Sequence, residues 1–256
     1  MNIEWSKYKR FFSFGCSFTR YMWPTWADVV SKQVSQAEFF NFGMSGAGNL
    51  QISARVAEAN SRFKFTDTDL IMVMFSSYCR EDRWVDGSWL SKGGVYVNGI
   101  YSPDWVRKFA DERGYLIRDA ALIDLTVKYI EALPCTFIPM LSVPFVIGSE
   151  HCDSSSEPPV DIVSVYSDTF SKFNKSMHES VLVGWDTDYK GFKDGHPSPI
   201  KYHDYLTNIG LELSPGTTQY AKDTTQILLD CKNRNILPTM FPEQDENISK
   251  ADRLLF

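Results

Sequence analysis

The chain has 256 residues, of which 43% are hydrophobic and 23% charged, and its formal net charge is −6. This composition is ordinary for a globular protein, and the length suits one domain that can bury a core without disulfides or metals. Lys and Arg are scattered without a basic stripe, and the longest apolar stretch, 137–147, is too short for a bilayer and contains two prolines. We therefore expect no nucleic-acid partner and no membrane segment.

The N-terminal residues are polar, so no signal peptide is evident and we expect a cytoplasmic protein. Five cysteines form no Cys-x-x-Cys pair, and their odd number leaves at least one unpaired, which favours reduced thiols. The four histidines lack the spacing of metal ligands. We expect no metal and no cofactor, so that any chemistry must come from side chains.

Strands alternate with helices along the sequence. Short, nearly continuous apolar runs predict buried strands, at 11–14, from 39 into the turn at 41–43, and at 69–75, 135–143 and 181–183. Helical spacing predicts helices at 23–33, 49–62, 106–133 (most regular from 120), 160–177, 200–209 and 218–231. This alternation indicates an α/β fold with a parallel sheet of about five strands and helices on both faces. We expect one domain over 1–235 and an irregular tail over 236–256.

The stretch 80–105 is long for a loop after a parallel strand. Within it, 95–97 lies between Gly-Gly and Asn-Gly, which predicts a small hairpin. Because it follows the third strand, this insertion is expected to form a wall or lid of the site. Trp84 and Trp89 could stack on sugar rings there, or merely anchor the loop.

Sites in parallel sheets form beyond the carboxyl ends of the strands, which points to the turns after the first three strands. Ser17 follows Gly15 just past the first strand, where it could act as a nucleophile near a helix start or simply cap that helix. Cys16 could serve instead, but adjacent side chains on an extended turn point apart. The second turn, 41–49, contains three glycines, which suit either close approach to a ligand or a plain turn.

A third segment with chemical potential lies near the C-terminus, where Asp194-Gly195 precedes His196. A loop histidine with an acidic neighbour is what a nucleophilic serine needs as general base and orienting group. The same residues also suit a solvated turn.

Together these segments resemble the SGNH (GDSL-like) hydrolases. Residues 15–19, Gly-Cys-Ser-Phe-Thr, look like the first block of that family, with Cys16 in place of the usual Asp. Residues 41–46, Asn-x-Gly-x-x-Gly, look like the second block, and 194–198, Asp-Gly-His-Pro-Ser, look like the last. Their order and separation also match, and the first block is similar to that of SGNH-like proteins from bacteriophages and some bacteria. The resemblance implies a three-layer α/β/α, flavodoxin-like fold.

The resemblance also implies hydrolysis of a small ester or thioester, often an acetyl group on a carbohydrate. By position, Ser17 would attack the carbonyl, His196 would take its proton, and Asp194 would orient His196. The backbone N–H groups of Ser17 and Gly46 would form two arms of the oxyanion hole. The partner would be a small-molecule or glycan ester, and a phage-encoded protein could be virion-associated.

The chain departs from the family in its third block, which usually supplies an Asn after the third strand. Residues 75–80 contain none, and removing one oxyanion donor costs ~100- to 1000-fold in rate. Asn49 is our first candidate to replace it, because it shares a turn with Gly46; Ser76 and Ser77 are the others.

A second departure concerns the acid. In the family the Asp lies three residues before the His, whereas Asp194 lies two before His196. Asp188 could orient His196 instead, or Ser17 and His196 could act as a dyad. These departures keep open a weakly active or inactive SGNH-like domain that binds glycans or has a structural role in a phage particle. A phosphate- or nucleotide-binding domain that uses the second turn is disfavoured, because no phosphate-loop lysine is present.

Overall fold

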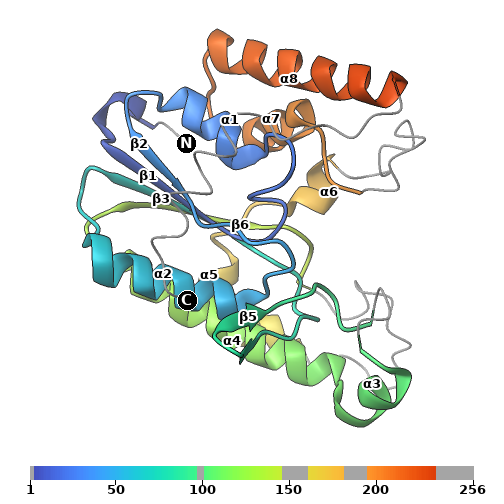
Figure 1. Cartoon of the computed structure of the whole chain (residues 1–256). Helices are drawn as coiled ribbons and strands as arrows, with labels where there is room; N and C mark the ends of the chain where they lie inside the picture. Colours follow the sequence, from blue (N-terminus) through green and yellow to red (C-terminus); the bar gives the residue numbers. More distant parts are fainter. Residues whose placement is uncertain (1–2, 97–100, 146–160, 182–194, 235–256) are drawn as a thin grey trace.

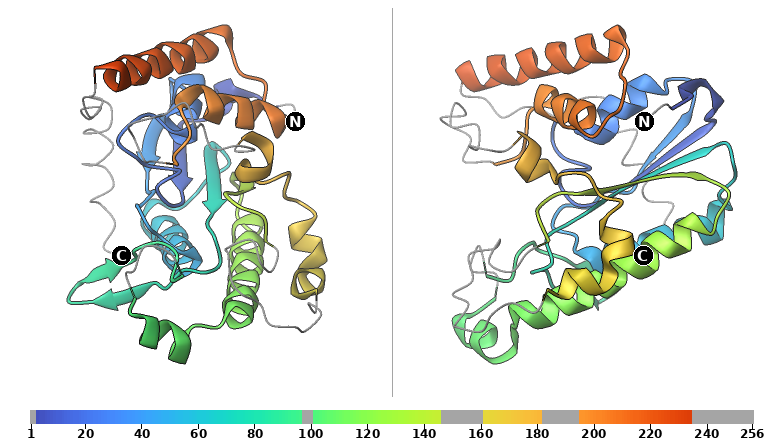
Figure 2. Two further views of the ribbon diagram at one scale, coloured as in Figure 1. Left: turned by 90° about the vertical axis from the view of Figure 1, so that its right-hand side faces the viewer. Right: turned by 180° about the vertical axis from the view of Figure 1, so that it is seen from behind.

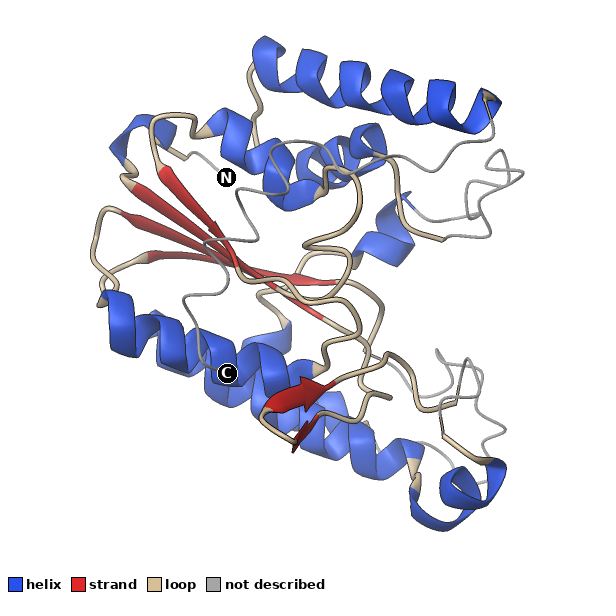
Figure 3. Cartoon of the chain, in the orientation of Figure 1, coloured by secondary structure: helices blue, strands red, loops and turns tan. Residues whose placement is uncertain are grey.

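The computed structural model describes residues 3–96, 101–145, 161–181 and 195–234 (Figure 1). Its main sheet consists of parallel strands in the order β2-β1-β3-β6. These strands are β1 (Arg10–Phe14), β2 (Glu38–Asn41), β3 (Asp69–Phe75) and β6 (Thr136–Leu141). Figure 3 shows this sheet between helices on both faces, so the predicted α/β class with a parallel sheet is confirmed.

The central strand β3 shows why its sequence is almost continuously apolar. It pairs with β1 on one side and β6 on the other, and all its residues are buried. The one charge, Asp69, is matched at the strand's start by Arg10, whose Nε and Nη2 lie 2.7 and 2.6 Å from its two carboxylate oxygens. The alignment of β1 with β2 likewise stacks Phe11 on Phe39 with their ring centroids 4.9 Å apart.

One face of the sheet is covered by α2 (Asn49–Phe63) and α4 (Glu112–Glu131) (Figure 1). Phe63, the last residue of α2, packs on Phe12 of β1 with their ring centroids 5.4 Å apart. A 3₁₀-helix (Ile162–Tyr166) and α5 (Ser167–Phe170) lie beside α4.

The opposite face is covered by α1 (Trp26–Gln33) and α7 (Pro199–Asn208), with α8 (Pro215–Asn233) packed outside them (Figure 2). Thr25 begins α1 with a capping box, in which its side chain accepts from backbone and Asp28 accepts in return from the Thr25 N–H. The helix therefore starts at Trp26, three residues later than predicted. One hydrophobic core joins both faces and includes residues from Tyr8 to Ala221.

Several predicted elements are corrected. The helix expected at 106–133 is two helices, α3 (Pro103–Phe109) and α4, because Asp111 caps α4 by accepting from two backbone N–H groups. The helix expected at 160–177 is broken into the 3₁₀-helix and α5, and α6 (Met177–Val181) begins only at its end. Val181, predicted to start a fifth strand, ends α6, and 182–183 lie outside the described residues. The main sheet thus has four strands within the described part of the chain.

The hairpin of the insertion is also displaced from its predicted position. It comprises β4 (Arg83–Val85) and β5 (Ser88–Leu90), joined by Asp86-Gly87 with φ of 50° and 78°. A two-residue turn with both φ values positive suits the twist of a hairpin, and Asp-Gly is a favoured pair there. At the predicted site Val95 is in no strand; its N–H donates to the Cys79 carbonyl (2.8 Å), and 97–100 lie outside the described residues.

The described helices include none that is both long enough and apolar enough to cross a bilayer.

Candidate functional site

Ser17 lies in a turn directly after β1. Gly15 permits this turn, because a Cβ there would overlap Thr19 Oγ1 and lie 2.9 Å from the Met74 carbonyl oxygen. The Cys16 carbonyl then accepts the N–H of Thr19 at 2.9 Å. Both side chains are buried, Cys16 fully and Ser17 with 8% of its surface exposed. Helix α1 begins only at Trp26, so the sequence-based placement of Ser17 at a helix start is wrong.

The turn that holds Ser17 is fastened to the glycine-rich turn after β2. Asn41 Nδ2 donates to the Thr19 carbonyl (3.0 Å), and Asn41 Oδ1 accepts from the Gly43 N–H (3.0 Å). The Met44 N–H also donates to the Gly15 carbonyl (3.0 Å). A Cβ on Gly43 would lie 2.9 Å from the Thr19 Cβ, so glycine is what lets the two turns touch. Asn41 therefore connects the two turns by hydrogen bonds, a role that was not predicted from the sequence.

Gly46, a predicted arm of the oxyanion hole, has a φ of 80° and packs against the insertion. Its carbonyl accepts from the Gly93 N–H at 3.2 Å, and a Cβ on Gly46 would lie 2.5 Å from the Ser91 carbonyl oxygen. The insertion thus covers the glycine-rich turn directly.

The insertion also caps α2. The N-cap residue of α2, Gly48, has no side chain with which to accept from the first helical N–H groups. Asp82 supplies the acceptor: its carboxylate lies 2.8 Å from the Gly48 N and 2.9 Å from the Gln51 N, and Ser91 Oγ donates to it at 2.5 Å. Arg80 adds a bond from its guanidinium to the Ala47 carbonyl (2.8 Å). A glycine at the start of a predicted helix was the only sign that a cap must come from elsewhere.

Asn49 does not fill the role of oxyanion donor predicted for it. Its amide nitrogen donates to the Ser76 carbonyl (3.0 Å) and to Asp119 Oδ2 (2.9 Å), and its amide oxygen accepts from the Ser76 N–H (2.8 Å). Both amide hydrogens are engaged, and the side chain is fully buried. Asn49 instead joins α2 to the end of β3 and to α4.

The carboxylate of Asp119, which accepts a hydrogen bond from Asn49, is fully buried. Arg118 Nε donates to it at 2.6 Å in addition to the bond from Asn49. Burial nevertheless outweighs these donors and raises the pKa of Asp119 to about 6.

Ser76 and Ser77 directly follow β3, the place where the resemblance to SGNH hydrolases leads us to expect an asparagine. The Ser76 hydroxyl lies 3.4 Å from the Ser77 carbonyl and 3.5 Å from the Asn49 amide oxygen, so it points toward Asn49. Ser77 Oγ accepts from the Cys79 N–H (3.3 Å), while within the described part of the chain its own hydroxyl hydrogen is assigned to no acceptor. Of the two, Ser77 is the better candidate for a free donor.

His196 lies against the turn that holds Ser17. Its ring stacks on Tyr21 with centroids 3.7 Å apart and an interplanar angle of 12°, and it contacts Phe18, the neighbour of Ser17, at 5.0 Å. Trp23 Nε1 holds the loop by donating to the carbonyl of Pro197 (2.8 Å), 174 positions along the chain. No hydrogen bond joins the described atoms of Ser17 and His196, but catalytic contacts often tighten only when substrate binds.

The other residues that the sequence predicts for the site are Asp194, Asp188, Trp84 and Trp89. Asp194 and Asp188 fall outside the described residues. Trp84 and Trp89 lie opposite each other on the hairpin, with ring centroids 5.7 Å apart, and Trp84 is 45% exposed. His203 belongs to α7, where its Nε2 lies 2.9 Å from Thr218 Oγ1 of α8.

No protein-family model matches this chain, and no curated protein matches it in sequence. Among solved structures, the chain is similar to the protein YxiM from Bacillus subtilis, with 8% identity and a TM-score of 0.39. The match covers 91% of this chain and 58% of YxiM, so the chain spans little more than half the length of that protein.

Proposed function

We propose that the protein is a serine esterase of the SGNH type that hydrolyses a small ester, such as an O-acetyl group on a carbohydrate. The observation that carries the proposal is the packing of His196 against Phe18, in the turn that holds Ser17, and against Tyr21 just after that turn. A nucleophile and its base must share one site, and the structure brings the segments of Ser17 and His196 together although they lie far apart in the sequence.

The strand order supports the flavodoxin-like, three-layer form of this proposal. The order β2-β1-β3-β6 corresponds to the first four strands of the doubly wound order 2-1-3-4-5. Ligands bind such sheets beyond the carboxyl ends of the strands, and the turns after β1, β2 and β3 lie there.

In the proposed reaction, Ser17 Oγ attacks the acyl carbon while His196 takes the hydroxyl proton. The alcohol leaves with that proton, and the acyl group stays on Ser17. His196 then deprotonates a water, which attacks the acyl carbon, and the acid leaves as Ser17 regains its proton. Asp194 remains the proposed partner that orients His196.

Charge on the tetrahedral oxygen would be stabilised by the backbone N–H groups of Ser17 and Gly46. Because both amide hydrogens of Asn49 are engaged, we assign the third donor to the Ser77 hydroxyl. The proposed substrate is a small-molecule or glycan ester. A cytoplasmic or virion-associated location stays a prediction from the sequence.

Covalent labelling with a fluorophosphonate probe, together with turnover of p-nitrophenyl acetate, tests this function. We expect the label on Ser17, and loss of both labelling and turnover in Ser17→Ala. Ser61→Ala, which removes an exposed serine of α2, should leave both unchanged. A label on Cys16, or turnover that survives in Ser17→Ala, would refute the assignment.

The engaged amide of Asn49 favours a second candidate, a related domain that binds glycans without turning them over. A site with only two backbone donors would stabilise the transition state poorly. This candidate predicts no labelling and no turnover by the folded protein, while glycan binding persists.

A further inference from the structure

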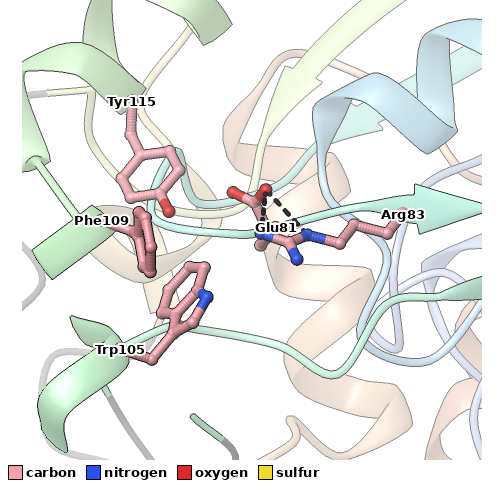
Figure 4. Close-up of a pocket in the computed structure, with 5 residues that line it drawn as sticks. All are labelled: Glu81, Arg83, Trp105, Phe109 and Tyr115. Carbon is pink, nitrogen blue, oxygen red and sulfur yellow. Dashed lines mark hydrogen bonds and ion pairs between the residues drawn. The ribbon is translucent and has the colours of Figure 1, made fainter. Parts of the chain in front are cut away.

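A pocket of about 410 Å³ lies between the insertion and the helices that follow it (Figure 4). This volume is within the range of ~300–1,000 Å³ that is usual for small-molecule sites. The residues that line it come from the start of the insertion, from α3 and from α4: Glu81, Arg83, Trp105, Phe109 and Tyr115.

One side of the pocket is aromatic. Trp105 is held in place, because Tyr101 stacks on it with ring centroids 4.3 Å apart and the Arg83 guanidinium lies 5.2 Å from its ring centroid. Phe109 follows one turn later on α3 and is 59% exposed. An exposed phenyl ring beside a fixed indole gives a ligand an apolar surface on which to stack.

The other side is polar, and its charges compensate one another. Glu81 Oε1 accepts from the Nε and Nη2 of Arg83, both at 3.2 Å, and Glu81 Oε2 lies 3.6 Å from Arg118 Nη1. Arg118 is paired in turn with Asp119. Burial and the neighbouring Glu81 carboxylate raise the pKa of Tyr115, so its hydroxyl is kept as a hydrogen-bond donor.

We propose that this pocket binds one sugar ring of a neutral oligosaccharide. A pyranose has an apolar C–H face and a rim of hydroxyls, which match the aromatic side and the fixed donors and acceptors opposite. An anion would face Glu81 and a cation would face Arg83, so the compensated pair favours a neutral ligand. This inference rests on the proposed function, since it places part of a glycan ester away from the reacting group.

The pocket is connected through its Glu81 segment to the glycine-rich turn that contains Gly46. Glu81 lies between Arg80 and Asp82, whose side chains hold Ala47 and the N-terminus of α2. A sugar bound on one side of this segment would therefore be held at a fixed position relative to the glycine-rich turn on the other.

Binding is tested on the full chain carrying Ser17→Ala, which cannot consume an ester. The probes are cellotetraose and tetra-N-acetylchitotetraose, with N-acetylneuraminic acid and choline as charged comparisons, all followed by calorimetry. We expect at least one neutral tetrasaccharide to bind, and Phe109→Ala to weaken it about tenfold. Phe109 is mostly exposed, so its truncation should not unfold the protein. Leu125→Ala, at an equally exposed position of α4 outside the pocket, should change nothing.

Binding of choline or of the anionic sugar alone, of no probe at all, or with equal strength in Phe109→Ala would overturn the proposal. In the chain that retains Ser17, Phe109→Ala should raise KM for an acetylated tetrasaccharide, whereas Leu125→Ala should leave it unchanged. If p-nitrophenyl acetate is not hydrolysed, the esterase proposal fails, whereas the calorimetry still decides whether the pocket takes a sugar.

Discussion

An oxyanion hole gains stabilisation with each donor that is already aimed at the developing charge. In this chain both amide hydrogens of Asn49 are engaged by Ser76 and Asp119. Ser77, which follows β3, carries a hydroxyl hydrogen that has no acceptor within the described part of the chain. The proposed site thus combines two backbone donors with one hydroxyl, where the SGNH hydrolases that the sequence resembles use an asparagine.

Replacing Ser77 with Ala should lower kcat about 100- to 1000-fold with little change in KM, because the lost contact strengthens only in the transition state. Steady-state kinetics with p-nitrophenyl acetate measure both constants. Ser76→Ala is the matched control, since its hydroxyl is turned toward Asn49 and the Ser77 carbonyl. Equal losses in kcat for the two variants would contradict the assignment.

The buried carboxyl of Asp119 predicts a pH effect on stability. Its folded pKa of about 6 lies above the ordinary 3.8, so the folded state holds the proton more tightly than the unfolded state. The stabilisation from protonation is complete below the ordinary value and is lost as pH rises through the folded one.

Urea unfolding of the wild type and of Asp119→Asn, at about pH 4 and about pH 7.5, tests this effect. Between these values the wild type should lose roughly 1–3 kcal/mol relative to the variant, which carries no titrating group at this position. A free-energy difference between the two proteins that stays constant with pH would show that Asp119 does not titrate in this range.

At the scale of elements, the N-terminus of α2 depends on a residue from a different loop. Asp82→Ala should destabilise the protein by about 1–2 kcal/mol, because it removes the acceptor for two helical N–H groups. Urea unfolding measures the change. Asp104→Ala is the control: it breaks the exposed pair with Arg107 and should cost less than about 0.5 kcal/mol. If the two losses are similar, Asp82 is not acting as a cap.

Elements whose patterns are local could be predicted well from the sequence. The strand expected at 69–75 is β3 (Asp69–Phe75), and the helix expected at 49–62 is α2 with one further residue. The hairpin was misplaced because β4 and β5 are mostly exposed and lack an alternating apolar pattern, although Asp86-Gly87 marks their turn.

The candidate site could be predicted only in part, for a different physical reason. Its turns follow from glycines and strand ends, which are visible locally. The engagement of Asn49 depends on Asp119, 70 positions later, and the cap of α2 depends on Asp82, 34 positions after Gly48. Hydrogen bonds between such distant segments follow from packing, which no local pattern encodes.

At the scale of the whole molecule, Trp23 connects two distant segments. Its indole N–H holds the loop that contains His196 and Pro197 against the segment that follows the Ser17 turn. Trp23→Phe keeps the ring packing but removes the buried bond to the Pro197 carbonyl, so His196 should be held less firmly. We expect kcat to fall about tenfold, as small misplacements of a base are costly. Trp5→Phe removes a similar but exposed bond, to the Glu212 carbonyl, and should leave kcat unchanged. An unchanged kcat in Trp23→Phe would show that this anchor does not position His196.

The hydrogen bonds between the insertion and the glycine-rich turn limit which segments can be exchanged between this chain and a related one. Residues 80–94 supply the cap of α2 and cover Gly46, so a chimaera that exchanges this segment alone would leave 43–51 without its support. The two segments should be transplanted, and inherited, as one unit. If the pocket binds a sugar as proposed, variants made to bind other ligands should keep Asp82 and change Trp105 and Phe109, which line the pocket.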